Sequence, residues 1–386
     1  MVFVNQLTLT SALGAGMDSL RESLRDERSG LTDRGWPGSD VECFLGIADI
    51  PSELCVPAQR ESRNNRLVEY ALQQDGFIDH VAACVSKHGA DRVGLVMGSS
   101  TSSVDRTEQA YAAMLEDQGE PAFADHFVQP ETHNPHAPGD YAALRLGIAG
   151  PCMTISAACA SSAKVFAVAQ RWLDQGWVDA VVVGGADSLC LSVIYGFHSL
   201  QLIAASPCRP FSPDRQGISL GEAAGFALLS TEPAQVQLLG VGESCDAYHM
   251  SSAHPEGLGA TLSMQRALQA AGLTIDDIDY VNLHGTGTRA NDETEARACS
   301  GMAGENTLFS ATKGWTGHAL GAAGIVESVL SINALLTGFV PGTMNTEQCE
   351  PELPVMLESQ QRQISTVLSN SFGFGGNNCS VVFGQS

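Results

Sequence analysis

The chain has 386 residues, and its 20 Lys and Arg against 43 Asp and Glu give a formal net charge of −23. Hydrophobic residues make up 44% of the chain and charged residues only 16%, which indicates a compact protein with a large interior and excludes disorder as its main state. The negative charge argues against nucleic acids and anionic membrane surfaces as partners, because both require a basic field.

Short apolar runs bounded by glycine alternate with longer helical patterns. We expect buried strands at residues 92–98, 179–185 and 279–285, and helices at residues 67–84, 162–175, 262–271, 291–299 and 325–336. This alternation predicts an α/β fold with strands covered on both faces. One strand-like run stops at Pro233, and a similar alternation follows it. We therefore expect a duplicated fold with an N-terminal half at residues 1–233 and a C-terminal half at residues 234–386.

The eleven cysteines are scattered and form no CxxC pair, which argues against a zinc ribbon. Reduced thiols of this kind are typical of a cytoplasmic protein. Residues 1–5 lack the basic start of a secretion signal, and no apolar run approaches the ~20 residues that a membrane span requires. We therefore expect a cytoplasmic protein without a membrane span.

Small residues surround Cys159 in the segment TISAACASSA, and a helical pattern follows it. A cysteine at the start of a helix lies at the positive end of the helix dipole, which favours the thiolate and hence a nucleophile. The alternative is a buried structural cysteine, which is the common state of a free cysteine.

Three further segments are candidates for catalytic chemistry. The sequence NLHGTGT places His284 at the end of an expected strand, where α/β sheets meet their ligands. The sequence TKGWTGHALGAAGIVE holds Lys313, His318 and Glu327 among small residues, so the lysine and the glutamate can pair. The glycine-rich NSFGFGGNN at residues 370–378 lacks the lysine of a P-loop and can offer backbone N–H groups to an oxyanion. A core histidine, a solvated lysine and a plain β-turn are the structural alternatives.

Together the four motifs resemble those of the elongating β-ketoacyl-acyl-carrier-protein synthases of the thiolase superfamily, the condensing enzymes of fatty acid and polyketide synthesis. The resemblance runs from about Arg92 to Phe383 and includes the segments PFSPDR, GEAAG and DAYHM. It implies an α/β fold of the thiolase type, in which two similar halves form α-β-α-β-α layers. It also implies a decarboxylative Claisen condensation with malonyl-carrier, without a metal or an organic cofactor.

The resemblance assigns a role to each catalytic candidate. Cys159 is the implied nucleophile that accepts the acyl chain as a thioester. His284 and His318 are the implied histidine pair, whose two Nε–H groups hold the enolate oxygen. Lys313 and Glu327 are the implied ion pair beside them.

The resemblance also implies gating elements. Phe374, which follows Gly373, is the implied aromatic gate, and its backbone N–H joins that of Cys159 in an oxyanion hole. The segment from Asp246 to Ser252 is the implied second gating segment.

Related enzymes differ at positions that can be checked. Ketoacyl synthase III and chalcone-type enzymes pair Cys and His with an asparagine, whereas this chain supplies His318. Thiolases use a late second cysteine as a base, but Cys379 lies in a strand-like run and we expect it in the core. The alternative from a different class of function is a non-catalytic chain length factor, which resembles a synthase but lacks the nucleophile; Cys159 is present here.

The implied partners are an acyl carrier protein and a second subunit, in a homodimer or in a heterodimer with a chain length factor. The chain is shorter than usual between Ser99 and Asn134, which affects the acyl pocket. The resemblance is almost equally compatible with two pathways, fatty acid elongation and the extension of polyenes or polyketides, aryl polyenes included. The motif HGTGT slightly favours the polyketide alternative.

Acyl carrier proteins are strongly acidic, so the charge of −23 requires screening or a local basic surface. Three arginines, Arg60, Arg63 and Arg66, stand at the head of an expected helix. We predict that they form a carrier-docking patch, with an ordinary solvated helix start as the alternative.

Overall fold

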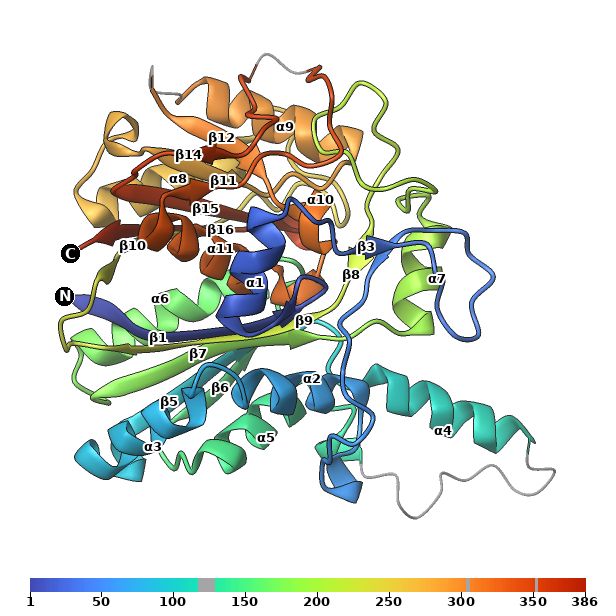
Figure 1. The fold of residues 1–386 in the computed structure, drawn as a ribbon, viewed down its shortest axis with the longest axis vertical. Coiled ribbons are helices and arrows are strands. Elements are labelled where there is room, and N and C mark those ends of the chain that lie inside the picture. Colours follow the sequence, from blue (N-terminus) through green and yellow to red (C-terminus); the bar gives the residue numbers. More distant parts are fainter. Residues whose placement is uncertain (117–128, 303–305, 351–352) are drawn as a thin grey trace.

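The computed structural model describes residues 1–116, 129–302, 306–350 and 353–386 (Figure 1). Its centre is one mixed sheet of eleven strands in the order β12-β11-β15-β16-β10-β1-β9-β7-β5-β6, with β2 paired to β1.

The strands of this sheet are β1 (Val2–Ser11), β2 (Gly14–Ala15), β5 (Val93–Gly98), β6 (Cys152–Ile155), β7 (Ala180–Asp187), β9 (Ala223–Ser230), β10 (Val236–Cys245), β11 (Tyr280–Leu283), β12 (Leu308–Ala311), β15 (Thr366–Gly373) and β16 (Asn377–Gln385). Two small sheets contain β3 (Leu31–Thr32), β4 (Leu45–Gly46) and β8 (Leu220–Gly221), and β13 (Phe339–Val340) and β14 (Gln360–Gln361). The helices are α1 (Gly16–Arg25), α2 (Arg63–Leu72), α3 (Phe77–His88), α4 (Val104–Glu116), α5 (Ala137–Leu146), α6 (Ser161–Asp174), α7 (Leu191–Ser199), α8 (Leu258–Ala271), α9 (Arg289–Ser300), α10 (Lys313–Thr316) and α11 (Ala323–Thr337).

The large sheet contains the same strand pattern twice. In the first half β5 pairs in parallel with β6 and β7, and β7, β9 and β1 then pair antiparallel. In the second half β11 pairs in parallel with β12 and β15, and β15, β16 and β10 then pair antiparallel. The two sets join where β1 pairs with β10. The predicted duplicated α/β fold is therefore confirmed.

The elements form five layers (Figure 1). Helices α6 and α11 lie in the middle layer, between the two sets of strands. Helices α2, α3 and α5 cover the outer face of the first set, and α8 and α9 cover that of the second. Strand β7 shows how the sequence produces this arrangement. Its Val181 and Val183 belong to the central core while Val182 belongs to the outer core, because successive side chains of a strand point to opposite faces.

Most of the predicted elements are confirmed, and one prediction is wrong. Strands β5, β7 and β11 and helices α6, α8, α9 and α11 lie where we expect them. The helix expected at residues 67–84 is instead two helices, α2 and α3. Asp75 and Gly76 between them have φ of 57° and 63°, which a continuing right-handed helix does not allow.

The stretch Leu320–Thr337 is long and apolar enough to span a membrane by length and composition, which corrects our expectation that no such run exists. Of its residues, 89% are buried inside the protein. Helix α11, which forms most of it, is apolar on nearly all sides because it packs between two layers of strands. The segment that we expect to be short, between Ser99 and Asn134, contains α4; its residues 117–128 lie outside the described residues.

Close packing of strand β5 on helix α6 yields a stability prediction. A Cβ at Gly98 would lie 2.4 Å from the backbone N of Ser162, so Gly98→Ala forces the helix away from the strand. We expect a loss of about 1–3 kcal/mol in the free energy of unfolding, measured by urea denaturation. The control is Gly196→Ala in α7, where the new Cβ meets nothing within 4 Å. That variant should be unchanged or slightly stabilised, and equal stability of both variants would refute the packing argument.

Candidate active site

Cys159 lies in a tight turn between strand β6 and helix α6. Ala158 has φ of 49°, a left-handed conformation that is uncommon for a residue with a side chain. The hydroxyl of Ser161 holds the turn, since it accepts a hydrogen bond from the Ala157 N–H at 2.8 Å and donates to the Ala158 carbonyl. The small residues around Cys159 make this turn possible, and the turn places the sulfur at the bottom of a cavity.

His284 lies at the end of strand β11, where the chain turns through Gly285 and Gly287 with φ of 41° and 78°. Glu295 of helix α9 holds this turn in place through hydrogen bonds. Its two carboxylate oxygens accept the backbone N–H groups of His284 and Gly285, each at 2.8 Å. The second half of the sheet therefore positions the first histidine through backbone contacts.

His318 lies between α10 and α11 and pairs with the chain at β8. Its backbone N–H donates to the Ser219 carbonyl at 2.7 Å, and its carbonyl accepts from Gly221 at 2.9 Å. A Cβ at Gly221 would lie 2.6 Å from the Thr316 carbonyl oxygen, so only glycine permits this close approach. The GEAAG segment thus supports the loop that carries His318.

The three candidate side chains meet within the cavity. The Nε2 atom of His318 lies 3.0 Å from the Sγ atom of Cys159. The rings of His284 and His318 are 5.5 Å apart between centroids and nearly perpendicular, at 86°. All three side chains are buried. The structure therefore brings the candidate nucleophile of the first half together with two histidines of the second.

Lys313 and Glu327 form a buried ion pair beside the histidines. Their side chains are 1% and 2% exposed, and the Lys313 Nζ contacts a carboxylate oxygen of Glu327. The same Nζ lies 3.2 Å from His284 Nδ1 and also donates to the His284 carbonyl. Because an ammonium only donates, His284 Nδ1 must accept, and the proton of this neutral imidazole lies on Nε2.

This tautomer decides what the triad can bind. A ligand atom from each of Cys159, His284 and His318 lies within 4.8 Å of the other two, a spacing compatible with a metal ion. A metal needs a lone pair from each histidine, however, whereas Lys313 leaves His284 with an N–H on Nε2. The arrangement suits hydrogen-bond donation to an oxygen better than metal coordination.

The pKa of Cys159 corrects our expectation that the helix start favours the thiolate. Burial raises the pKa of this thiol to about 12, and the nearby Lys313 offsets only part of the effect. Desolvation penalises the charged form more than the helix dipole favours it. The resting group is thus a thiol, and the neighbouring His318 Nε2 is the nearest acceptor for its proton.

Both histidines are neutral at physiological pH. Burial lowers the pKa of His284 well below its ordinary value, and the charge of Lys313 and the neighbouring His318 add to the effect. Burial and Lys313 do the same to the pKa of His318. Two neutral imidazoles can pass on a proton or donate a hydrogen bond without first losing a charge.

The predicted gating residues lie together above Cys159. A Cβ at Gly373 would lie 3.1 Å from the backbone N of Cys159, so this glycine allows strand β15 to approach the nucleophile. The ring of Phe374 stacks on Phe197 of helix α7, with centroids 6.0 Å apart. Asp246 connects the second predicted segment to this turn, since its carboxylate accepts from Asn378 Nδ2 at 2.9 Å and from the His254 N–H at 2.7 Å.

The cavity above Cys159 has a volume of about 520 Å³. It reaches Cys159, His284 and His318, and Phe197 and Phe374 are among its walls. Its size and mixed apolar and polar lining are those of a small-molecule site. Cys379 lies elsewhere, fully buried in strand β16, in agreement with our expectation of a core residue.

The three arginines at the head of α2 do not form a free basic patch. Arg63 is bound by the buried Glu222 through two hydrogen bonds and lies over the ring of Trp36. Arg66 donates to the carbonyls of residues 51 and 52. Two of the three charges are thus used within the protein, which weakens the predicted docking patch; a role for the half-buried Arg60 stays a prediction.

Sequence reasoning missed two buried carboxylates that position the site. One is Glu295 beneath the His284 turn. The other is Asp187 at the end of β7, which accepts hydrogen bonds from Ser100, Thr101 and, at 2.6 Å, the Gly321 N–H. Asp187 thereby ties the loop after β5 to the loop after His318. For Asp187 the available signal was an acidic residue at the end of an apolar strand, since a buried carboxylate requires donors. Glu295 stands in a polar helical segment that gives no such signal.

Two family descriptions match the chain. Residues 66–234 match "Beta-ketoacyl synthase, N-terminal domain", and residues 236–347 match "Beta-ketoacyl synthase, C-terminal domain". These ranges contain Cys159 in the first case and His284, Lys313, His318 and Glu327 in the second.

Three curated relatives align with nearly the whole chain. The 3-oxoacyl-[acyl-carrier-protein] synthase 2 of Synechocystis sp. is 29% identical and covers 99% of this chain and 97% of the relative. The enzyme of the same name from Vibrio harveyi is 33% identical, with coverage of 99% and 98%. Nodulation protein E of Rhizobium sp. is 32% identical, with coverage of 97% and 96%.

Solved structures agree with the fold. A chain from the ketosynthase ApeO in complex with its chain length factor ApeC, from Xenorhabdus doucetiae, has 38% identity and a TM-score of 0.92, with coverage of 100% of this chain and 98% of that chain. A chain of the ishigamide ketosynthase/chain length factor has 25% identity and a TM-score of 0.90, with coverage of 100% and 99%. The fold and the Cys-His-His site thus define a thiolase-type condensing enzyme. The chain belongs to the β-ketoacyl synthase family and is an acyltransferase.

The raised pKa of Cys159 leads to a prediction about its reactivity. Iodoacetamide attacks the thiolate, so the alkylation rate of Cys159 should rise with pH through pH 10 without a plateau near the ordinary thiol pKa. Peptide mass spectrometry measures the rate, with the exposed Cys245 as the internal reference. A plateau for Cys159 below pH 9 would contradict the dominance of burial.

The ion pair of Lys313 and Glu327 leads to a second prediction. Lys313→Met leaves the Glu327 carboxylate buried without its cation, and we expect a loss of about 3–5 kcal/mol in the free energy of unfolding. The double variant Lys313→Met/Glu327→Gln should regain a large part of this loss. Arg34→Met serves as the control, because it breaks an exposed pair with Asp49 and should cost less than about 1 kcal/mol. Equal losses from the two single variants would contradict the effect of burial.

Proposed function

We propose that the chain condenses an acyl group held on Cys159 with a malonyl group delivered by an acyl carrier protein, releasing CO₂. The observation that carries this proposal is the contact of 3.0 Å between Cys159 Sγ and His318 Nε2, with His284 beside them at the bottom of one cavity. A thiol, a proton acceptor and a second N–H donor are the groups that both half-reactions need.

The first half-reaction is the transfer of the acyl group. Cys159 Sγ attacks the thioester carbonyl as its proton passes to His318 Nε2, and the proton then leaves with the thiol of the carrier. The backbone N–H groups of Cys159 and Phe374 are the proposed donors to the tetrahedral oxyanion. The close approach of Gly373 to the Cys159 nitrogen supports this role.

The second half-reaction forms the carbon–carbon bond. Loss of CO₂ from the malonyl thioester leaves an enolate, whose oxygen receives a hydrogen bond from Nε2–H of His284. His318 adds a second hydrogen bond once the proton of its neutral ring has moved from Nδ1 to Nε2 by exchange with water. The enolate carbon then attacks the Cys159 thioester and expels the sulfur as a thiolate. The thiolate takes the Nε2 proton of His318, and His318 Nδ1 takes up one proton from solvent, which is the proton that the overall condensation consumes. Lys313 supports this step because it holds the His284 proton on Nε2, and Glu327 keeps the ammonium compensated in the interior.

We place the protein in a polyene or polyketide pathway, aryl polyenes included, ahead of fatty acid elongation, and in a heterodimer with a chain length factor ahead of a homodimer. The HGTGT motif and the 38% identity to a chain from a ketosynthase and chain length factor complex support this choice.

We also propose a boundary between the two halves at residues 233 and 234, which the repeated strand pattern supports. A cytoplasmic location is a further proposal, and the eleven free cysteines support it.

The proposed division of labour can be tested with defined acyl-carrier and malonyl-carrier substrates. The wild-type protein should gain one acyl mass, and Cys159→Ala should gain none. His284→Ala should still be acylated, because the hydrogen-bond contact with the sulfur belongs to His318, but its release of CO₂ from malonyl-carrier should fall by about 10²–10³-fold. Intact-mass spectrometry and a CO₂ assay measure the two steps.

Cys55→Ala is the matched control, because this thiol is exposed, contacts the Glu53 carbonyl and is absent from the described lining of the cavity, and it should behave as wild type. A wild-type protein that gains no acyl mass, alone or with a candidate partner, would refute the catalytic proposal and favour a chain length factor. Loss of acylation in His284→Ala would refute the separation of the two histidines.

A further inference from the structure

Two arginines line the cavity that leads to Cys159, and they differ in how firmly they are held. Arg215 comes from the PFSPDR segment and Arg289 is the first residue of helix α9. The side chain of Arg215 is fully buried, whereas that of Arg289 is 61% exposed. Among the described residues that line the cavity, Arg289 is the only basic side chain that is more than half exposed.

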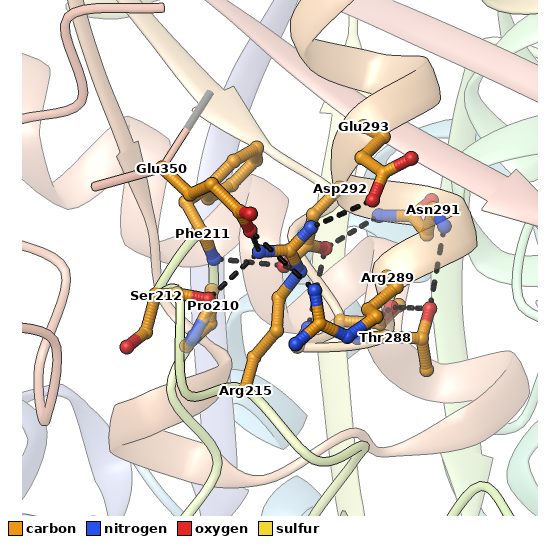
Figure 2. A network of polar contacts seen from close by, with 12 residues as sticks. Pro210, Phe211, Ser212, Arg215, Thr288, Arg289, Asn291, Asp292, Glu293 and Glu350 are labelled. Atoms are coloured by element: carbon orange, nitrogen blue, oxygen red, sulfur yellow. Dashed lines mark hydrogen bonds and ion pairs between the residues drawn. The ribbon is translucent and has the colours of Figure 1, made fainter.

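Carboxylates on several sides hold Arg215 in place (Figure 2). Its guanidinium lies 2.5 Å from Glu350, 3.2 Å from Glu293 and 3.7 Å from Asp292. It also donates to the Ser212 carbonyl at 2.7 Å. Arg215 thus compensates these carboxylates and cross-links the PFSPDR segment to helix α9, and it has little capacity left for a ligand.

Arg289 has weaker contacts. It lies 3.7 Å from Glu350, whose carboxylate is already bound by Arg215, and it donates to the Pro213 carbonyl at 3.1 Å. An exposed ion pair of this kind contributes little, so the guanidinium can exchange Glu350 for a stronger anion at small cost. Arg215 offsets part of the charge of the three carboxylates and leaves Arg289 as the available cation.

We propose that Arg289 binds the phosphate of the phosphopantetheine arm on which a carrier protein presents its thioester. This inference rests on the proposed function, because the arm must enter this cavity for its thioester to reach Cys159. The phosphate is the charged group of that arm, and a guanidinium can bind it with two parallel hydrogen bonds. Thr288, which also lines the cavity, precedes Arg289 and places it beside the path to the nucleophile.

The charge of the whole chain makes such a contact useful. An acidic carrier meets a protein with a net charge of −23, and two of the three arginines predicted to receive it are occupied by their own protein. A cation within the cavity mouth acts over a few ångströms, where salt screens the interaction least. Arg289 thus supplies locally the attraction that the overall charge denies.

The test uses two unreactive ligands, S-methyl-4′-phosphopantetheine and S-methyl-pantetheine, which differ only in the phosphate. Each is titrated against the wild-type protein, and the half-maximal concentration that protects Cys159 from iodoacetamide is measured by peptide mass spectrometry. We expect the phosphorylated ligand to protect at a concentration about tenfold lower. In Arg289→Ala the two ligands should protect at nearly equal concentrations, and Arg289→Lys should restore part of the difference.

The control is Arg297→Ala on the same helix, because the Arg297 side chain donates to the Pro255 carbonyl and is not among the described residues that line the cavity. It should keep the full difference between the ligands. Equal protection in the wild-type protein, or an unchanged difference in Arg289→Ala, would overturn the proposal. Because neither ligand can transfer an acyl group, this result is independent of whether the chain catalyses condensation.

Discussion

The site depends on one buried ion pair, that of Lys313 and Glu327. Two charges in an interior are stable only together, so the pair fixes the loop after β12 against helix α11. The lysine then uses a further N–H on His284 Nδ1, which sets the tautomer of that histidine and lowers its pKa. A charge kept away from the substrate thus determines which hydrogen-bonding group the substrate meets.

Burial favours the neutral form of the cysteine, the two histidines and the two glutamates of the site. It keeps Cys159 a thiol and both histidines neutral, and it raises the pKa of Glu295 to about 7 and that of Glu327 to about 6. The reacting groups therefore carry no net charge before the substrate arrives. Charge that develops during the reaction then meets fixed donors in an environment that screens it poorly.

The duplicated fold explains how the site is assembled. Cys159 follows a strand of the first half, whereas both histidines and the ion pair belong to the second. Helices α6 and α11 pack against each other in the middle layer and bring the two sets together. Asp187 strengthens the junction, because it is on the first half and binds Gly321 on the second. Neither half alone contains the complete set of reacting groups.

The order of residues was enough to predict the alternation of strands and helices, the duplication and the side chains that the structure brings together around Cys159. Apolar periodicity and glycine-rich motifs are local features, so they can be recognised without knowing what each segment packs against. The break at Asp75 and Gly76 has a signal in the sequence, since residues 73–76 are polar or glycine and Asp-Gly favours a turn. Our prediction of one helix gave more weight to the apolar patterns on either side of this segment.

Tertiary structure alone decided the electrostatics. The helix start predicted a thiolate at Cys159, but burial by distant segments outweighs the dipole. The arginines of α2 form a charge pattern in the sequence, yet Glu222, 159 residues from Arg63, occupies one of them. Arg289 has no such pattern around it in the sequence, and its relation to Cys159 becomes visible only because both residues line one cavity. Charges act through space, so their partners and their solvent exposure depend on contacts that the order of residues does not specify.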